Sequence, residues 1–259
     1  MSPDGTSQSD RPFLLYCPSF GKRLVGDFFG VDRMFDVAIH DYSGDVYTGP
    51  KEAEYQFAGS LHKWPAIDRN LHTIGKKYQY YAFFDDDIVV STDQINELFM
   101  TGQREALCLF QAALSPVSVG TYFFHFQKKH TEDTSRSVPL VEIMMPVFSR
   151  SMLEKCRGTF AMSESGWGLD LLWREYASPL SVVDGVVVGH TAPVTSSSWV
   201  LSSGLRPIEE KHLILADNDL RELDERFLGG PLRWRVGQWA LRFFYRIERA
   251  WHRRNSVGN

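Results

Sequence analysis

The sequence predicts an α/β fold in which a central sheet and the helices that cover it form three layers. Through the first half of the chain, short apolar runs with strand character alternate with helical hydrophobic patterns, which is typical of this class. The chain has 259 residues, of which 43% are hydrophobic, enough to bury one full core. We expect one domain over residues 11–215, a disordered segment at 1–10 and a helical extension at 216–259.

The chain opens with a pattern typical of a strand, a helix and a second strand. Phe13–Cys17 and Met34–Ile39 are buried-strand candidates, and residues 21–33 between them are expected to form a helix. Ligands of such sheets bind beyond the carboxyl ends of the strands. Ser19 and Asp41, which follow the two strands, are therefore candidate nucleotide-binding residues, although ordinary loop residues also occur there.

A helix with one apolar face follows a loop-like segment at residues 44–59. The helical pattern covers residues 61–78 and places its apolar residues at Trp64, Ile67, Leu71 and Ile74. Lys63 stands at the start of this helix, where a lysine can bind phosphate. A solvated lysine is the simpler alternative.

Three consecutive carboxylates interrupt the apolar run Tyr80–Val90. In an extended strand, alternate side chains share a face, so Asp85 and Asp87 would project to one side and Asp86 to the other. Two carboxylates on one face suit Mg²⁺ or Mn²⁺, which reach a protein through a few carboxylates and the oxygens of a substrate diphosphate. The alternative is a solvated turn or a helix N-cap.

The next elements continue the alternation and then break it. A short helix at 91–102 leads to a strand at Ala106–Leu114, and Ser115–Pro139 is too long for a plain connection, which suggests a lid, a binding loop or disorder. Val141–Ser149 returns to strand character. Glu142 in that run faces either an acceptor pocket or solvent.

A second informative stretch is Gly166–Glu175, where two glycines bracket Trp167. The glycines allow a tight turn that presents the indole as a platform, and Asp170 falls in the first turn of the helix that follows. The alternative is a core tryptophan and a capping aspartate. A β-branched strand at Ser181–Val188 then ends beside His190, and a histidine at a strand end is more often structural than a ligand.

The cysteines and the N-terminus indicate a reducing compartment. Cys17, Cys108 and Cys156 are odd in number and far apart, so neither a disulfide framework nor a zinc cluster is expected. No signal peptide or membrane span is visible, and we expect a cytoplasmic protein.

Taken together, these pieces resemble the GT-A class of nucleotide-sugar glycosyltransferases. Within that class they are similar to a plant and bacterial family that is described mainly as a domain of unknown function. The resemblance spans residues 13–195, and a Rossmann-like mixed sheet flanked by helices is the fold it implies. The matching motifs are KWPAI at Lys63–Ile67, DDDI at Asp85–Ile88, VEIMMPVFS at Val141–Ser149, GWGLD at Gly166–Asp170 and VVDGVVVGH at Val182–His190.

The resemblance implies a donor and metal site around the aspartates. Asp85, with Asp86, would bind the nucleotide-sugar donor, and Asp87 and Asp85 would bind a divalent ion whose shell is completed by His190. An imidazole ligand favours Mn²⁺ over Mg²⁺. Four further residues are assigned to donor binding: Lys63, Asp41, Ser19 and Trp167.

The resemblance also implies a catalytic base and an inverting single displacement. Asp170 would take the proton of the acceptor hydroxyl, with Glu164 and Asp184 as rivals because this chain has one carboxylate where some families have two in a row. Residues 192–207 are a candidate lid. A sugar-nucleotide nucleotidyltransferase is the second hypothesis, although residues 17–24 hold only one glycine, and a non-catalytic binding protein is the third.

The end of the chain is a basic segment outside the resemblance. Residues 231–259 contain seven Arg and one Glu, and on a helix five of the arginines form one stripe opposite an aromatic face. This helix would either dock on the domain or lie on the anionic inner face of the cytoplasmic membrane, near a polysaccharide, lipopolysaccharide or lipid-linked acceptor. Nucleic acid is a poorer partner, because the acidic rest of the chain would repel a polyanion, and no nucleic-acid partner is expected.

Overall fold

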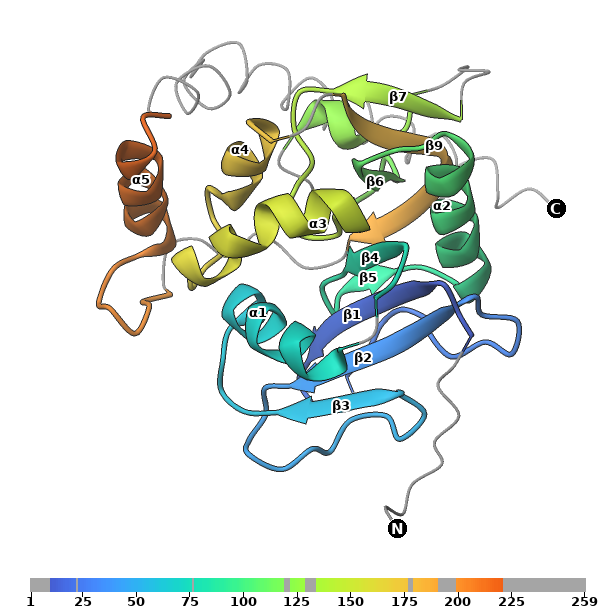
Figure 1. Cartoon of the computed structure of the whole chain (residues 1–259), viewed down its shortest axis with the longest axis horizontal. Coiled ribbons are helices and arrows are strands. Elements are labelled where there is room, and N and C mark those ends of the chain that lie inside the picture. Colours follow the sequence, from blue (N-terminus) through green and yellow to red (C-terminus); the bar gives the residue numbers. More distant parts are fainter. Residues whose placement is uncertain are drawn as a thin grey trace, which may run out of the picture.

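The computed structural model describes residues 10–21, 23–75, 77–118, 122–128, 134–176, 179–190 and 199–220. These residues form a nine-stranded mixed sheet with helices on both faces (Figure 1). Along the sheet the strand order is β3-β2-β1-β4-β8-β6-β9-β5, and β7 also pairs with β9. The predicted three-layer α/β class is therefore confirmed.

One half of the sheet is parallel. It contains β1 (Phe13–Ser19), β2 (Phe35–Asp41), β3 (Tyr55–Ala58) and β4 (Tyr80–Phe83). Every residue of β1, β2 and β4 is buried, as expected for strands covered on both faces. The carboxyl ends of β1, β2 and β4 therefore meet at one edge of the sheet.

The other half is mixed. β8 (Val147–Ser149) runs antiparallel to both β4 and β6 (Leu109–Leu114), and β6 runs parallel to β9 (Leu180–His190). Two short strands, β7 (Ser135–Val138) and β5 (Ile88–Val89), pair antiparallel with β9. The end of β9 is thereby brought next to the segment that follows β4.

Helices cover the two faces unequally. α1 (Lys63–Ile74), α3 (Arg150–Cys156), the 3₁₀ segment η2 (Arg157–Met162) and α4 (Leu169–Arg174) share one hydrophobic cluster. α2 (Thr92–Arg104) packs in the cluster on the opposite face. Alternate residues of the buried strands enter alternate clusters, in keeping with the period of two.

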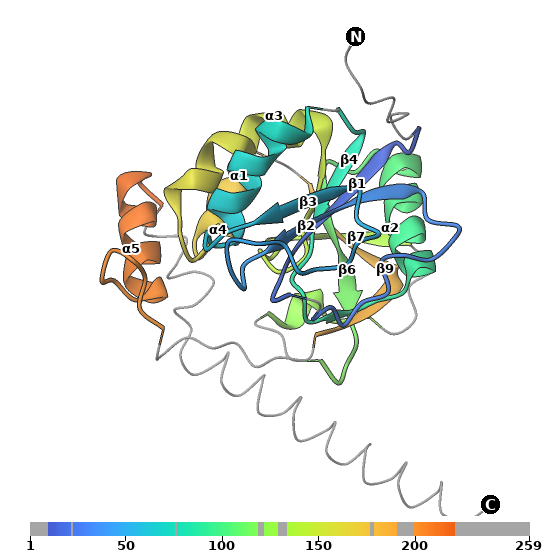
Figure 2. The ribbon, with the colours of Figure 1, turned by 90° about the horizontal axis from the view of Figure 1, so that it is seen from below.

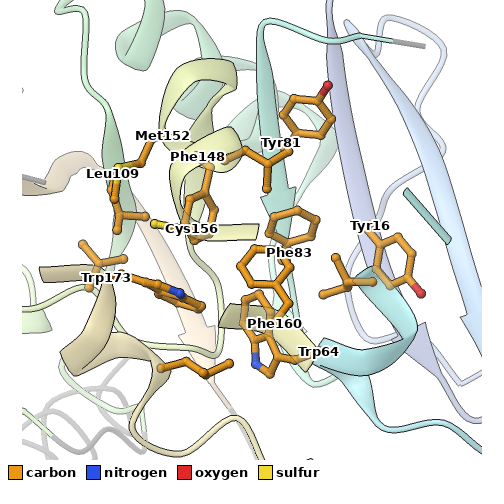
Figure 3. Packing of buried hydrophobic residues seen from close by; sticks show 14 of the residues in the cluster. Tyr16, Trp64, Tyr81, Phe83, Leu109, Phe148, Met152, Cys156, Phe160 and Trp173 are labelled. Carbon is orange, nitrogen blue, oxygen red and sulfur yellow. The ribbon is translucent and has the colours of Figure 1, made fainter. Parts of the chain in front are cut away.

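Aromatic side chains fill the centre of the first cluster (Figure 3). The Trp64 ring lies 4.9 Å from that of Phe160 and 4.7 Å from that of Trp173, both edge-on. Edge-to-face pairs of this kind stabilise a core beyond the area they bury. The start of α1 is therefore fixed by the same cluster that holds α4.

Two elements complete the described chain. η1 (Phe123–His125) is one 3₁₀ turn in the long connection after β6. α5 (Pro207–Asp217) is the outermost helix and lies next to α4 in both views of the ribbon (Figures 1 and 2). The domain boundary expected between residues 215 and 216 falls inside α5, and the residues expected at 231–259 to form a basic helix lie outside the described residues.

Several expectations about local structure are wrong. The described residues of 21–33 contain no helix, because their backbone donors pair with distant carbonyls: Val25 N–H donates to Asp86 and Asp27 N–H to Val90. Residues 44–59, expected as a loop, contain β3, and the strand expected at 141–149 is confined to β8. Tertiary pairing overrides the local pattern in each case.

Candidate active site

The three aspartates form a turn and not a continuous strand. β4 ends at Phe83 and β5 begins at Ile88, so residues 85–87, here called the carboxylate turn, connect two strands. The Phe84 amide donates to Tyr16 of β1 at 3.0 Å, and the Asp85 amide donates to Met144 at 2.9 Å. These bonds hold the turn at the carboxyl ends of β1 and β4, the edge where ligands of α/β sheets bind.

The first carboxylate is paired with a lysine. Lys63 Nζ lies 2.7 Å from Asp85 Oδ1, and the Asp85 side chain is 35% exposed. Desolvation raises the pKa of Asp85, while the charge and hydrogen bond of Lys63 oppose that shift. The solvated lysine expected as an alternative is therefore not observed, since Lys63 also donates to the carbonyl oxygens of Ile143 at 2.7 Å and Met144 at 3.3 Å.

The third carboxylate is paired with a histidine. His190 Nε2 lies 3.2 Å from Asp87 Oδ2, because β5 pairs antiparallel with β9 and sets His190 opposite Ile88. Although burial opposes ionisation of Asp87, the hydrogen bond and charge of His190 hold its pKa below the ordinary value. The fold thus brings together two predicted metal ligands that are far apart in the sequence.

The chemistry of these donors fits a divalent ion. Carboxylate oxygens with one imidazole nitrogen suit Mn²⁺, and Asp87 and His190 already touch. Asp85 instead faces the Lys63 ammonium, and no group of three or more His, Cys, Asp or Glu residues in the described part of the chain is arranged to hold a metal. An ion held by Asp85 and Asp87 would either use the second oxygen of Asp85 or displace Lys63 from the first.

The middle carboxylate lies beside an aromatic pair that sequence reasoning missed. Tyr42 donates its hydroxyl hydrogen to Asp86 Oδ2 at 3.3 Å, and its ring lies 5.6 Å from that of Phe20. Phe20 is 55% exposed and Tyr42 39% exposed, so both rings are accessible at the ends of β1 and β2. The signal in the sequence is an aromatic residue directly after each strand.

Ser19 and Asp41 lie beneath these rings. Both are completely buried, and Asp41 accepts hydrogen bonds from Gly21, Ser43 and Thr48. Burial opposes ionisation of Asp41, but the Ser43 and Thr48 donors hold its pKa far below the ordinary value. In this structure the two side chains organise the loops that carry the aromatic pair, and neither reaches the surface.

The Gly-Trp-Gly turn packs against the start of α1. Gly166 has φ +82°, and a Cβ there would lie 2.5 Å from Cδ1 of Trp64 and 3.2 Å from Cδ1 of Ile143. Only glycine permits this conformation and this approach. Trp167 is partly exposed between the two glycines. The turn contacts Trp64, which follows Lys63, and Ile143, whose carbonyl accepts a hydrogen bond from Lys63.

Asp170 is a buried acid in a cluster of charged groups. It is 9% exposed, and its Oδ1 accepts a 3.0 Å hydrogen bond from the Leu171 amide. Desolvation and the nearby charge of Glu142 raise its pKa to about 6, against lowering contributions from Lys211 and His125. A carboxyl group of that pKa is ionised at neutral pH yet is a stronger base than an ordinary aspartate.

Glu142 connects this cluster to the carboxylate turn. Its carboxylate is buried 3.2 Å from His125 Nδ1, while His125 Nε2 lies 2.8 Å from the Leu140 carbonyl. The next two carbonyls along the chain, those of residues 143 and 144, accept from Lys63. Glu142 is buried and does not point to solvent, and residues 142–144 lie between the two acidic sites.

The rival bases have other partners. Asp184 forms a buried 2.6 Å ion pair with Arg136. Glu164 lies 2.9 Å from His62 Nε2 and accepts hydrogen bonds from the amide and hydroxyl of Ser202. Of the lid expected at 192–207, only residues 199–207 are described, and there Trp199 lies 5.1 Å from the His62 ring.

Comparisons with known proteins show a likeness of fold. Neither a family model nor a curated protein sequence matches this chain. The structure of S. aureus TarS 1–349 in complex with UDP-GlcNAc aligns at 11% identity and a TM-score of 0.48, covering 83% of this chain and 73% of that chain. TarS 1–349 in complex with UDP aligns at 12% identity and 0.43, covering 71% and 60%.

A third similar structure is A197 from STIV, at 16% identity and a TM-score of 0.41, covering 70% of this chain and 85% of that chain. At these identities and TM-scores, the likeness assigns no activity, substrate or partner to this chain.

Burial of Asp170 predicts a pH-dependent stability. Since its pKa of about 6 in the folded protein lies above the ordinary aspartate value of 3.8, the unfolded chain loses this proton first, and stability falls as pH rises through that interval. Asp170→Asn removes the effect. The free energy of unfolding of the variant relative to wild type should increase by about 1 kcal/mol between pH 5 and pH 8, at 1.36 kcal/mol per pKa unit.

Urea unfolding at both pH values measures this difference. Asp45→Asn, at an exposed loop position, is the matched control and should follow the wild type at each pH. Parallel pH profiles for wild type and Asp170→Asn would contradict the prediction.

Proposed function

We propose that this chain is a divalent-metal-dependent glycosyltransferase of the GT-A type that moves a sugar from a nucleoside diphosphate donor to a hydroxyl acceptor. The observation that carries the proposal is the placement of the carboxylate turn and buried Asp170 on either side of residues 142–144. One site has the oxygen ligands that a metal–diphosphate complex requires, and the other has a base of raised pKa. An inverting, metal-assisted transfer of a sugar to a hydroxyl group uses both.

On the donor side, Asp85, Asp87 and His190 would hold the ion, with Mn²⁺ favoured over Mg²⁺ because of the imidazole. The ion, when bound, supplies positive charge that stabilises the departing diphosphate. Lys63, at the N-terminus of α1, would exchange Asp85 for phosphate oxygens. The pair of rings at the ends of β1 and β2 offers a stacking surface for the nucleobase.

On the acceptor side, Asp170 would act as the general base. The acceptor oxygen attacks the anomeric carbon, the bond from that carbon to the diphosphate oxygen breaks, and the hydroxyl proton passes to the Asp170 carboxylate. Attack from the face opposite the leaving group inverts the anomeric centre. We favour Asp170 over Asp184 because Asp184 forms an ion pair with Arg136. We favour it over Glu164 because Ser202 and His62 hold the pKa of Glu164 low, despite the cost of burial, which makes Glu164 a weaker base.

Donor binding and donor hydrolysis distinguish this proposal from its alternatives. A thermal-shift panel of nucleotide sugars with and without Mn²⁺ would identify the donor, since a ligand at a hundredfold excess over its Kd adds about 2.7 kcal/mol to apparent stability. Slow donor hydrolysis without acceptor is expected of a transferase and not of a binding protein. Release of pyrophosphate from a nucleoside triphosphate and a sugar phosphate would instead indicate a nucleotidyltransferase.

Asp87→Ala should abolish Mn²⁺-dependent donor binding and leave the protein folded. The variant loses a metal ligand. It should still fold, because the ion pair that it removes, between Asp87 and His190, lies at the edge of the core, where the Asp87 side chain is 16% exposed. The thermal shift produced by donor plus Mn²⁺ measures the loss. Asp45→Ala, which removes an exposed loop carboxylate, should keep the full shift. An unchanged shift in Asp87→Ala would rule out this metal site.

Asp170→Asn should bind donor normally and transfer sugar 10²–10⁴-fold more slowly, the usual contribution of a general base. The amide cannot accept the proton, but it preserves the shape of the side chain and leaves the carboxylate turn intact. Single-turnover transfer and donor thermal shifts measure the two properties separately. Normal turnover would move the base assignment to Glu164 or Asp184.

The acceptor proposed here is a polysaccharide, lipopolysaccharide or lipid-linked glycan at an anionic membrane surface. The basic amphipathic pattern of residues 231–259 supports this proposal. Within the described part of the chain, no helix combines the length and apolar character needed to cross a membrane. The basic segment is the part of the chain to which we assign the membrane contact.

Vesicle sedimentation tests the membrane contact. The full chain should sediment with vesicles that contain anionic lipid, and a chain ending at Gly230 should remain in the supernatant, because it lacks the seven arginines of residues 231–259. Neutral vesicles serve as the control for charge. Equal binding by both chains, or none by either, would rule out the membrane role, and lower solubility of the shorter chain would favour docking on the domain.

A further inference from the structure

α5 fastens the turn that carries Asp170. The Glu210 carboxylate accepts hydrogen bonds from the hydroxyl of Ser163 at 2.8 Å, from the amide of Glu164 at 2.7 Å, and from the amide and hydroxyl of Ser165 at 2.9 Å and 2.5 Å. Four donors from three consecutive residues converge on one side chain. The segment immediately before the Gly-Trp-Gly turn is therefore held by α5, a helix that lies beyond the family resemblance.

The next residue of α5 packs on the turn itself. Gly168, the N-cap of α4, has φ +93°, and a Cβ at this position would lie 3.3 Å from Lys211 Cγ and 3.7 Å from Lys211 Cα. Lys211 is only 5% exposed. Burial of an ammonium group is costly unless a carboxylate pairs with it, and Asp170 stands two residues after Gly168.

We propose that α5 completes the acid–base site, with Lys211 as a positioning residue whose ammonium balances the buried charge of Asp170, and with Glu210 holding the turn in place. The catalytic consequence rests on the proposed function, whereas the coupling between the two charges does not. The motifs that carry the family resemblance end before α5 begins, so they do not indicate this contribution.

The charges around Asp170 explain why the lysine is needed. The titratable groups that act on Asp170 most strongly are Glu142, Lys211 and His125, from three separate segments. His125 is itself engaged by Glu142 and by the Leu140 carbonyl. Without Lys211, two carboxylates would share a buried site with one histidine, and like charges at close range favour the protonated form.

The test is the titration of Asp170 in wild type, Lys211→Met and Lys211→Arg, followed by carboxyl ¹³C NMR on aspartate-labelled full-length protein. Asp170→Asn identifies the signal. Lys211→Met should raise the titration midpoint by about one pH unit or more, a tenfold change in proton affinity, and Lys211→Arg should restore it. Lys155→Met, at an exposed lysine of α3, is the matched control and should leave the midpoint unchanged.

An unchanged midpoint in Lys211→Met would overturn the proposal. If this variant fails to fold, the double variant Lys211→Met/Asp170→Asn should fold, because both buried charges are then gone. A double variant as unstable as the single one would equally overturn the proposal. If sugar transfer is observed, the acidic limb of its rate profile should move with the NMR midpoint. Absence of transfer in wild type would refute the proposed function and leave the NMR result standing.

Discussion

The contact on which the arrangement of the site depends is the cluster of hydrogen bonds around the Lys63 ammonium. Lys63 donates to a carboxylate of the turn and to two backbone carbonyls of residues 143 and 144, so one side chain joins α1, the carboxylate turn and the turn before β8. Hydrogen bonds donated by a charged ammonium group are stronger than those between neutral groups. It also offsets the repulsion within a turn of three consecutive carboxylates.

The two acidic sites are held in different electrostatic states. In the carboxylate turn each aspartate is partly exposed and faces its own partner. Against the cost of burial, the hydrogen bond and charge of His190 hold the pKa of Asp87 below its ordinary value. Asp170 lies in the interior, and desolvation raises its pKa. Environments that separate the proton affinities of two carboxylates allow one chain to bind a metal with one and move a proton with the other.

The parts of the fold that depend on local sequence could be predicted, and those that depend on distant partners could not. Strands β1, β2, β6 and β9 and helices α1 and α2 follow apolar patterns within single segments. Residues 21–33 carry a helical pattern, but their amides pair with the carboxylate turn and the residue after β5. α5 has mixed polarity around its axis, because buried Lys211 and the Glu210 hydrogen bonds replace a simple apolar face.

The same distinction applies to the site. The aspartates, His190 and Asp170 could be singled out because charged residues in or beside apolar runs are conspicuous. Their partners could not: the contacts of Lys63 with residues 143 and 144, and of Lys211 with the Gly-Trp-Gly turn, join residues that are distant in the chain. Nothing in the sequence around Ser19 and Asp41 indicates that both side chains are buried and hydrogen-bonded to residues of the adjoining loops.

The glycines of the Gly-Trp-Gly turn connect these observations. Gly166 and Gly168 both have left-handed φ values, and the turn they permit is clamped between Trp64 on one side and Lys211 on the other. Trp64 follows Lys63 directly, and its ring is fixed among the aromatic residues of the core (Figure 3). The position of Asp170 relative to the carboxylate turn is therefore set by a short path of packed groups, through the turn, Trp64 and Lys63. Proton transfer and charge stabilisation on one substrate require that fixed separation, because groups that must reorganise at the moment of reaction lose much of their effect.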